Sequence, residues 1–267
     1  MYAFQYRRAA TLQEAGEQLA RDAEARPLAG GMTLIPTLKQ RLAQPTQLID
    51  ISGLAELRGI EVQGSVLTLG AATRHQQVAA SPVVREALPA LAALAAGIGD
   101  PQVRNRGTLG GSVANNDPAA DYPAAVLGLN AKVVTNRREI AADDFFQGLF
   151  ATALEPGELI VRIAFPVPRR AAYAKFPHPA SGYAMAGVFV AETAAGVRVA
   201  VTGAGPGVFR WTEAEQALAG KMDPSALVKL ALPADDLNED IHGSREYRAH
   251  LARVMAGRAV ASLVESN

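Results

Sequence analysis

Two glycine-rich segments hold the residues of this sequence whose types and spacing could bind a charged ligand. The first is Ala29–Pro36 (AGGMTLIP) and the second is Thr108–Asp121 (TLGGSVANNDPAAD). In each of them, paired glycines stand beside hydroxyl side chains. Glycine lets successive backbone N–H groups point into one concavity and lets an anion approach without meeting a Cβ atom. Both segments therefore indicate phosphate binding.

A pyrophosphate needs several donors, and the first segment can supply backbone N–H groups from Gly31 to Leu34. A helix that begins near Leu34 would add its dipole. Hydroxyls would come from Thr33, Thr108 and Ser112, and the Asp121 carboxylate can accept from a ribose hydroxyl. The fingerprints G-x-G-x-x-G and G-x-x-x-x-G-K-[ST] are both missing from the sequence, which disfavours Rossmann and P-loop folds. On spacing alone, a plain tight turn remains the alternative.

The composition narrows the classes of function. Lys plus Arg and Asp plus Glu number 26 each, so no net field would draw the chain to nucleic acid or to an anionic membrane. No apolar run approaches a membrane span, and the first residues lack a secretory pattern, so we expect a cytoplasmic protein. The sequence has no cysteine, which excludes iron–sulfur clusters held by its own thiolates. Redox chemistry here would need an organic cofactor.

The apolar periodicity predicts an α+β chain. Thr11 and Glu14 form a possible capping box, and Gly64-Ser65 indicates a hairpin, which makes an all-parallel sheet unlikely. We expect strands at 26–29, 48–51, 59–63, 66–70, 131–135 and 159–165, and helices at about 34–42 and 82–96. The segment Gly97–Asp121 has little apolar periodicity and is predicted to be a functional loop.

A proline-rich and arginine-rich stretch, Pro166–Arg170, is typical of a linker. We place the domain boundary there, which gives domains 1–168 and 169–267. In the second domain, 185–191 and 197–202 should form antiparallel strands, and 212–218 and 244–264 should form helices. On the last helix, Tyr247, Leu251 and Val254 are expected to share a face.

The two glycine-rich segments and their surroundings resemble the FAD-binding medium subunits of the xanthine dehydrogenase and aerobic carbon monoxide dehydrogenase family of molybdenum hydroxylases. That family's first motif, A-G-G-x-[ST]-L-[LI]-P, stands here as Ala29–Pro36. Its second, T-[IL]-G-G-[NS] continuing to an aspartate, stands as Thr108–Asp121. Further similar stretches are RNRG at 104–107, ELI at 158–160, KF at 175–176, SGYA at 181–184 and DLNEDIH at 236–242. The resemblance spans nearly the whole chain.

The resemblance implies an FAD-binding domain of the p-cresol methylhydroxylase type, in two α+β subdomains, followed by a small C-terminal domain with an antiparallel sheet and helices. It implies an oxidoreductase subunit that carries FAD and transfers electrons. These would come from [2Fe-2S] clusters on a small subunit and pass to NAD, a quinone or another acceptor. The molybdenum cofactor would belong to a large subunit, in a dimer of heterotrimers.

The family pattern also implies the cofactor-binding residues. These are Ala29, Gly30, Gly31, Met32, Thr33, Leu34, Ile98, Thr108, Gly111, Ser112, Asn115, Asp121, Ile160, Lys175 and Tyr183. The pyrophosphate would lie on 29–34 and on Thr108, Gly111 and Ser112. Ile98 and Ile160 would pack against the flavin or the adenine, with Lys175 near the pyrimidine edge and Tyr183 by the ring face. Met32 would contact FAD mainly through its backbone.

Other interpretations remain open on the sequence. The chain could be a self-contained flavoenzyme of the same superfamily, such as a UDP-sugar enolpyruvate reductase, or a phosphate-binding or scaffolding module without redox chemistry. Lys175 could be a solvated surface lysine, and Tyr183 could be a core aromatic. No side chain is expected to act as a nucleophile or a metal ligand. The four histidines are expected to be structural or surface residues, and among them only His242 and His250 are expected to approach each other.

Overall fold

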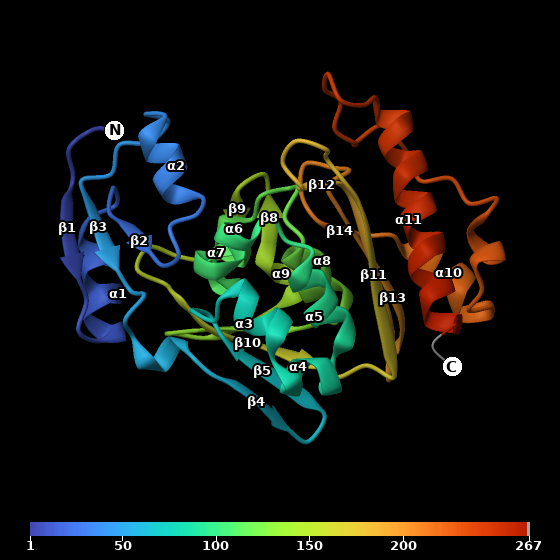
Figure 1. The fold of residues 1–267 in the computed structure, drawn as a ribbon, viewed down its shortest axis with the longest axis horizontal. Coiled ribbons are helices and arrows are strands. Elements are labelled where there is room, and N and C mark those ends of the chain that lie inside the picture. Colours follow the sequence, from blue (N-terminus) through green and yellow to red (C-terminus); the bar gives the residue numbers. More distant parts are fainter. Residues whose placement is uncertain (266–267) are drawn as a thin grey trace.

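The structure is a computed structural model that describes residues 1–265. Its three larger sheets lie side by side in chain order, from a three-stranded sheet at the N-terminus through a five-stranded one to a four-stranded one near the C-terminus (Figure 1). Helices pack between and outside the sheets. The predicted α+β class is confirmed.

The first subdomain is a parallel sheet of order β1-β3-β2 with two helices. Its elements are β1 (Gln5–Arg8), α1 (Leu12–Arg21), β2 (Arg26–Leu28), α2 (Leu34–Lys39) and β3 (Gln47–Asp50). Thr11 caps α1, since its Oγ1 accepts from the Glu14 N–H at 3.1 Å. The helix α2 ends at Lys39 and not near residue 42, because Arg41 adopts a left-handed φ of 60°.

The second subdomain is built on an antiparallel sheet of order β4-β5-β10-β6-β7. Its strands are β4 (Ile60–Gln63), β5 (Val66–Gly70), β6 (Lys132–Thr135), β7 (Glu139–Ala141) and β10 (Ile160–Pro166). A small hairpin adds β8 (Phe146–Gly148) and β9 (Ala151–Thr152). The helices are α3 (His75–Ala80), α4 (Pro82–Ala87), α5 (Pro89–Ala96), α6 (Pro101–Arg106), α7 (Leu109–Asn115), α8 (Tyr122–Gly128) and α9 (Ala142–Phe145). The predicted hairpin at Gly64-Ser65 is confirmed.

Two helix predictions for this subdomain were wrong. The expected single helix from 82 to 96 breaks at Leu88, because Pro89 restricts the residue before it, which takes φ −150° and ψ 69°. The expected loop from 97 to 121 contains the short helices α6 and α7. The side chains of Asp100 and Thr108 cap them by accepting from the N–H groups of Val103 and Gly111. Such short helices leave no visible apolar periodicity.

The C-terminal part is an antiparallel sheet with helices on its outer face. The strands are β11 (Arg170–Pro177), β12 (Ala184–Thr193), β13 (Gly196–Thr202) and β14 (Phe209–Arg210), and the helices are α10 (Thr212–Gly220) and α11 (Arg245–Glu265), with a 3₁₀ turn at Pro224–Leu227. The predicted face of α11 was partly wrong. Leu251 is buried, but Tyr247 is 41% exposed, and the buried face instead includes Arg248, Met255 and Ala259.

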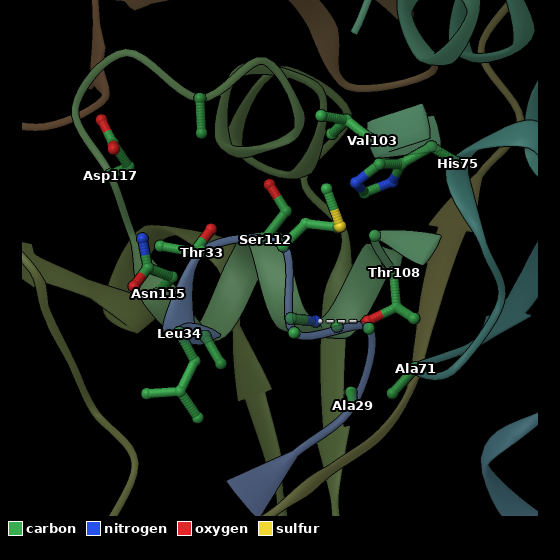
Figure 2. Close-up of a pocket in the computed structure, with 18 of the residues that line it drawn as sticks. Ala29, Thr33, Leu34, Ala71, His75, Val103, Thr108, Ser112, Asn115 and Asp117 are labelled. Atoms are coloured by element: carbon green, nitrogen blue, oxygen red, sulfur yellow. Dashed lines mark hydrogen bonds between the residues drawn. The ribbon is translucent and has the colours of Figure 1, made fainter. Parts of the chain in front are cut away.

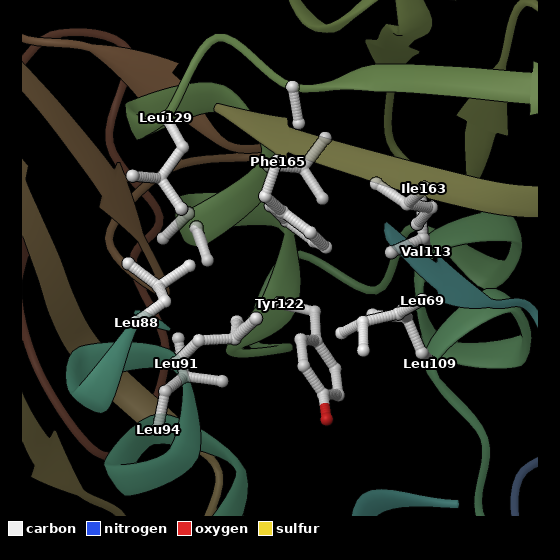
Figure 3. Close-up of a cluster of buried hydrophobic side chains, with 14 of the residues drawn as sticks. Leu69, Leu88, Leu91, Leu94, Leu109, Val113, Tyr122, Leu129, Ile163 and Phe165 are labelled. Atoms are coloured by element: carbon white, nitrogen blue, oxygen red, sulfur yellow. The ribbon is translucent and has the colours of Figure 1, made fainter. Parts of the chain in front are cut away.

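Both faces of this sheet are covered, which explains the unbroken apolar run of β12. One face packs against α10 and α11 around Trp211, and the other packs through Phe189 and Ala200 into the core of the second subdomain. That core gathers Leu88, Leu91, Tyr122 and Phe165 (Figure 3). Shared apolar burial therefore joins the C-terminal sheet to the subdomain before it.

No helix within residues 1–265 is both long and apolar enough to cross a membrane.

Candidate functional site

The two glycine-rich segments meet at one cavity of about 620 Å³. It lies between the first subdomain, the helices α6 and α7, and the loop 180–183 of the C-terminal sheet. Thr33, Ser112, Asn115 and His75 all surround the same space (Figure 2). Of the residues expected to bind cofactor, Lys175 alone does not line the cavity. A cavity of this size is typical of a cofactor site.

The two segments touch through their backbones. A Cβ atom added at Gly30 would lie 2.0 Å from the Arg106 carbonyl oxygen and 2.9 Å from the Gly107 Cα. Gly110 similarly lies against Ala71, where a Cβ atom would meet the Ala71 Cβ at 2.5 Å. Neither position tolerates a side chain without movement of its neighbour. Gly30 therefore sets how closely the first turn approaches the chain that leads into the second turn, and Gly110 sets how closely the second turn approaches Ala71. Sequence reasoning had assigned these glycines to phosphate approach alone.

The first turn presents unused donors. Gly31 has a left-handed φ of 75°, which directs the chain into α2. Within residues 1–265, the backbone N–H groups of Gly31, Met32, Thr33 and Leu34 make no hydrogen bond. Since backbone donors at a cavity wall are normally satisfied, four successive free ones indicate an acceptor supplied by a ligand.

The second turn presents hydroxyl and amide side chains in place of free backbone donors. The N–H groups of Leu109, Gly110 and Gly111 already donate to the Thr73 carbonyl, the Ala71 carbonyl and the Thr108 Oγ1, at 2.9, 2.8 and 3.2 Å. In the described part of the chain, the side chains of Ser112 and Asn115 make no hydrogen bond. The second segment can therefore contribute the Ser112 hydroxyl and the Asn115 amide to a ligand.

A buried ion pair lies behind the cavity wall at Asp121. The Lys175 Nζ donates to the carbonyls of Gly97 and Gly182, at 2.8 and 3.0 Å, and lies 3.0 Å from Asp121 Oδ1. The Tyr173 hydroxyl donates to the same carboxylate at 2.6 Å. Burial raises the pKa of Asp121, and the charge of Lys175 and the Tyr173 hydrogen bond oppose that shift. The surface interpretation of Lys175 was wrong, because its side chain is only 10% exposed.

The two ends of the cavity are apolar. Leu28, Ile51, Leu57, Leu159 and Ile160 line the end toward the first subdomain, and Ile98, Val103 and Tyr183 line the end toward the C-terminal sheet. The Arg104 guanidinium holds the latter end by donating to the Ile98 carbonyl at 3.0 Å. Tyr183 is 45% exposed, which excludes the alternative of a core aromatic. The sequence of apolar, polar and apolar walls fits an elongated ligand with an anionic centre and two flat ends.

Glu158 holds the start of β10 at this cavity. Its carboxylate accepts from the Arg138 Nε and the Thr135 hydroxyl, at 3.0 and 2.8 Å, and from the Glu155 N–H. Burial alone would raise the pKa of Glu158, but these hydrogen bonds outweigh it and lower the pKa to about 2. The carboxylate therefore fixes the strand that carries Leu159 and Ile160.

His75 is a cavity residue that sequence reasoning missed. It is 5% exposed and lies 5.3 Å from the Tyr122 ring, measured between centroids. Burial and the charge of Arg104 lower the pKa of His75 to about 4, so the imidazole is neutral at pH 7. Its Nδ1 has no partner within residues 1–265. In the sequence, the only signal that His75 is buried is its position directly after Thr73-Arg74 and before an apolar helix.

The expectation for the remaining histidines was partly wrong. His178 and His242 meet edge to face, with ring centroids 4.4 Å apart, although they are distant in sequence. His250 instead lies beside Arg253. Across residues 1–265, no three His, Asp or Glu side chains gather in a group that could hold a metal.

Sequence profiles decide the family. The profile described as "FAD binding domain in molybdopterin dehydrogenase" matches residues 2–168, and "CO dehydrogenase flavoprotein C-terminal domain" matches residues 171–263. The chain belongs to the FAD-binding subunits of the molybdopterin dehydrogenases. The family predicted from the two glycine motifs is confirmed, and FAD is the cofactor of the N-terminal part of this FAD-binding subunit.

Individual relatives match over most of their length. The chain is 37% identical to the carbon monoxide dehydrogenase medium chain of Hydrogenophaga pseudoflava over 253 residues, covering 89% of this chain and 88% of that one. It is 35% identical to the nicotine 6-hydroxylase medium subunit of Paenarthrobacter nicotinovorans, covering 97% and 96%. The solved carbon monoxide dehydrogenase of Oligotropha carboxidovorans superimposes on the FAD-binding subunit with a TM-score of 0.91 at 33% identity, covering 100% of this chain and 99% of that one.

The cavity of this FAD-binding subunit fits FAD. The free N–H groups of the first turn and the Ser112 hydroxyl suit a pyrophosphate, since they are neutral donors grouped on one wall. The two apolar ends suit the adenine and the isoalloxazine ring.

Replacing Gly30 with alanine should weaken FAD binding. The new Cβ atom would lie 2.0 Å from the Arg106 carbonyl oxygen, so the turns must separate, at a cost of about 1–3 kcal/mol in unfolding free energy. We expect FAD affinity to fall at least tenfold in a fluorescence titration. Gly257→Ala is the matched control, because no atom lies within 4 Å of its added Cβ. Equal affinity in the two variants would contradict this account of the turns.

His75 should make the chain less stable in acid. Its pKa is about 4 in the folded chain and 6.5 as a model value, so the unfolded chain binds the proton more readily between these pH values. The contribution of His75 is therefore fully present above pH 6.5 and is lost as the pH falls toward 4.

We expect the unfolding free energy of the parent chain to fall more steeply over this window than that of His75→Phe, by about 3 kcal/mol near the lower limit. Urea titrations at several pH values measure the difference. His250→Phe, at an exposed position of α11, is the control. Parallel stability curves for the parent chain and His75→Phe would show that His75 carries no such penalty.

Proposed function

We propose that this chain is the electron relay of a molybdenum hydroxylase complex. It takes electrons from [2Fe-2S] clusters of a small partner subunit and passes them to NAD, a quinone or another acceptor, while a large partner subunit carries the molybdenum cofactor. The medium-chain and medium-subunit names of the relatives support this place in an assembly. The three subunits would form a heterotrimer that pairs into a dimer of heterotrimers.

The row of free donors at the first turn carries the proposal most directly. The N–H groups from Gly31 to Leu34 have no partner among residues 1–265, and these four residues line the cavity that both glycine segments line. We assign the pyrophosphate to these groups and to Ser112. Thr33, Thr108, Gly111 and Asn115 complete the polar wall. Gly111 would contribute by letting the cofactor approach its backbone closely, because its N–H already donates to the Thr108 Oγ1.

The remaining expected residues hold the ends of the cofactor. We assign Ile160 to the adenine end, and Ile98 and Tyr183 to the isoalloxazine end. When bound, FAD exchanges electrons singly with iron–sulfur centres and in pairs with acceptors such as NAD or a quinone. The chain's own contribution is to bind and orient it.

Lys175 and Asp121 position the part of the cavity wall that we assign to the isoalloxazine ring. The three polar hydrogens of the ammonium meet the Gly97 carbonyl, the Gly182 carbonyl and Asp121, so Lys175 fixes the loops on either side of Ile98 and Tyr183. We place the domain boundary between residues 168 and 169, and the limits of the two profile matches, 2–168 and 171–263, support this position.

The test is the cofactor content and the redox partners of the purified chain. We expect about one FAD per chain, identified by its visible spectrum and by chromatography after denaturation, if necessary after adding FAD. In the complex with the molybdenum and iron–sulfur subunits, the flavin absorbance should bleach anaerobically with one member of a panel of carbon monoxide, purines, aldehydes and nicotine-like heterocycles. The FAD-loaded chain alone should not respond.

Bleaching of the isolated chain by the same panel would instead show a self-contained flavoenzyme. Failure to bind FAD, both alone and in co-expression with the partner subunits, would contradict the cofactor assignment.

A further inference from the structure

A second cavity, of about 400 Å³, lies behind the first glycine turn. It shares Ala29, Gly30, Ala72 and Thr108 with the FAD cavity. The rest of its lining is dominated by arginines from four separate segments: Arg8 at the end of β1, Arg58 before β4, Arg74 before α3 and Arg106 at the end of α6. We call this cavity the arginine pocket.

The arginine pocket concentrates positive charge, and the charge of Arg8 also acts on Asp50 and lowers the pKa of that carboxylate. Its lining contains no acidic residue, and among residues 1–265 none of the four arginines forms a salt bridge. Arg58 donates to the Ser52 carbonyl at 2.6 Å, and the nearby Asp50 already accepts from the Tyr6 hydroxyl and the Ser52 N–H. In a chain with a net charge of +0, this concentration of one sign focuses its field on an anion.

The hydrogen-bond donors of the arginine pocket are arranged as in a protein–protein interface and not as in a phosphate site. Several backbone N–H groups of the lining are already used: Ser52 donates to Asp50, Ala72 to the Leu57 carbonyl and Arg74 to the Gln77 side chain. Phosphate sites usually converge such amides on one point. Here the donors are exposed guanidinium groups on four segments. Guanidinium groups pair bidentately with carboxylates, and arginine is enriched at interfaces.

We propose that the arginine pocket receives a carboxylate-rich segment of a partner subunit in the complex. The inference rests on the proposed function, which makes the chain one subunit of an assembly. Because Ala29, Gly30 and Thr108 separate this pocket from the FAD cavity, a subunit that docks here lies one backbone layer from the cofactor. Its carboxylates also hold the two glycine turns together, so docking and FAD retention reinforce each other.

The experiment reverses the charge of the pocket in the intact complex. Arg74→Glu with Arg106→Glu is co-expressed with the iron–sulfur and molybdenum subunits, and association is measured by co-purification and by titration of the purified chain into the partner subunits. The control is Lys229→Glu with Arg258→Glu, which makes the same charge change at two exposed residues that form no salt bridge among residues 1–265. Thermal melting checks that each variant is folded.

We expect the pocket variant to bind its partners at least tenfold more weakly and the control to bind like the parent chain. The affinity of the parent complex should fall with NaCl concentration, and the variant should lose most of that salt dependence. If the double reversal does not fold, Arg74→Gln with Arg106→Gln tests the same change in salt dependence.

Assembly of the folded pocket variant at the parent affinity would overturn the proposal. A second result would also overturn it: inorganic phosphate or ATP raises the melting temperature of the parent chain but not that of the pocket variant, while the two assemble equally well. The pocket would then be a small-anion site. FAD content, measured separately on each isolated chain, distinguishes this failure from failure of the proposed function.

Discussion

The contact of one backbone with another at Gly30 is the constraint on which the site depends. No Cβ atom fits between Gly30 and the Arg106 carbonyl, so the turn after β2 can lie directly against the chain that leads into α7. That contact places the free N–H groups of Gly31 to Leu34 opposite the side chains of Ser112 and Asn115. It also leaves only a thin wall between the FAD cavity and the arginine pocket. The contact at Gly30 therefore affects both the FAD cavity and the arginine pocket, which share Gly30 in their walls.

The C-terminal sheet completes the site from the other side. Its strand β11 carries Tyr173 and Lys175, which hold the Asp121 carboxylate at the start of α8. The Thr202 hydroxyl of β13 lies within hydrogen-bonding distance of the carbonyls of Pro118 and Ala120, at 2.9 and 2.7 Å. The segment between α7 and α8 is therefore shaped by residues that follow it in the sequence by more than 50 positions. A buried ion pair of this kind fixes geometry more than it adds stability.

The sequence alone predicted the parts of the molecule that depend on local patterns. The hairpin at Gly64-Ser65, the cap at Thr11 and the antiparallel strands β12 and β13 were predicted from local sequence patterns, and the structure confirms them. The helices α6 and α7 were missed because they lack apolar periodicity and are marked in the sequence only by their capping residues and, in α6, by a proline. The buried face of α11 was misplaced because Arg248, a charged residue, is buried through bonds to the Met185 and Gly203 carbonyls.

The residues predicted to bind the cofactor, apart from Lys175, line one cavity, but the sequence did not predict the geometry of that cavity. Motifs identified the two turns, but only the structure shows that the N–H groups of the first are free while those of the second are used. His75, the contact of His178 with His242, and the arginine pocket each join segments that are distant in the sequence, so spacing could not reveal them. The gathering of Arg8, Arg58, Arg74 and Arg106 in particular depends on how the first subdomain packs against α3 and α6.

The most direct test of the central claim is an experimental structure of the FAD-loaded chain within its complex. The account predicts that the pyrophosphate oxygens lie within hydrogen-bonding distance of the N–H groups of Gly31 to Leu34 and of the Ser112 hydroxyl, with the isoalloxazine ring beside Ile98 and Tyr183. A pyrophosphate bound elsewhere, with these N–H groups still unpaired, would contradict it.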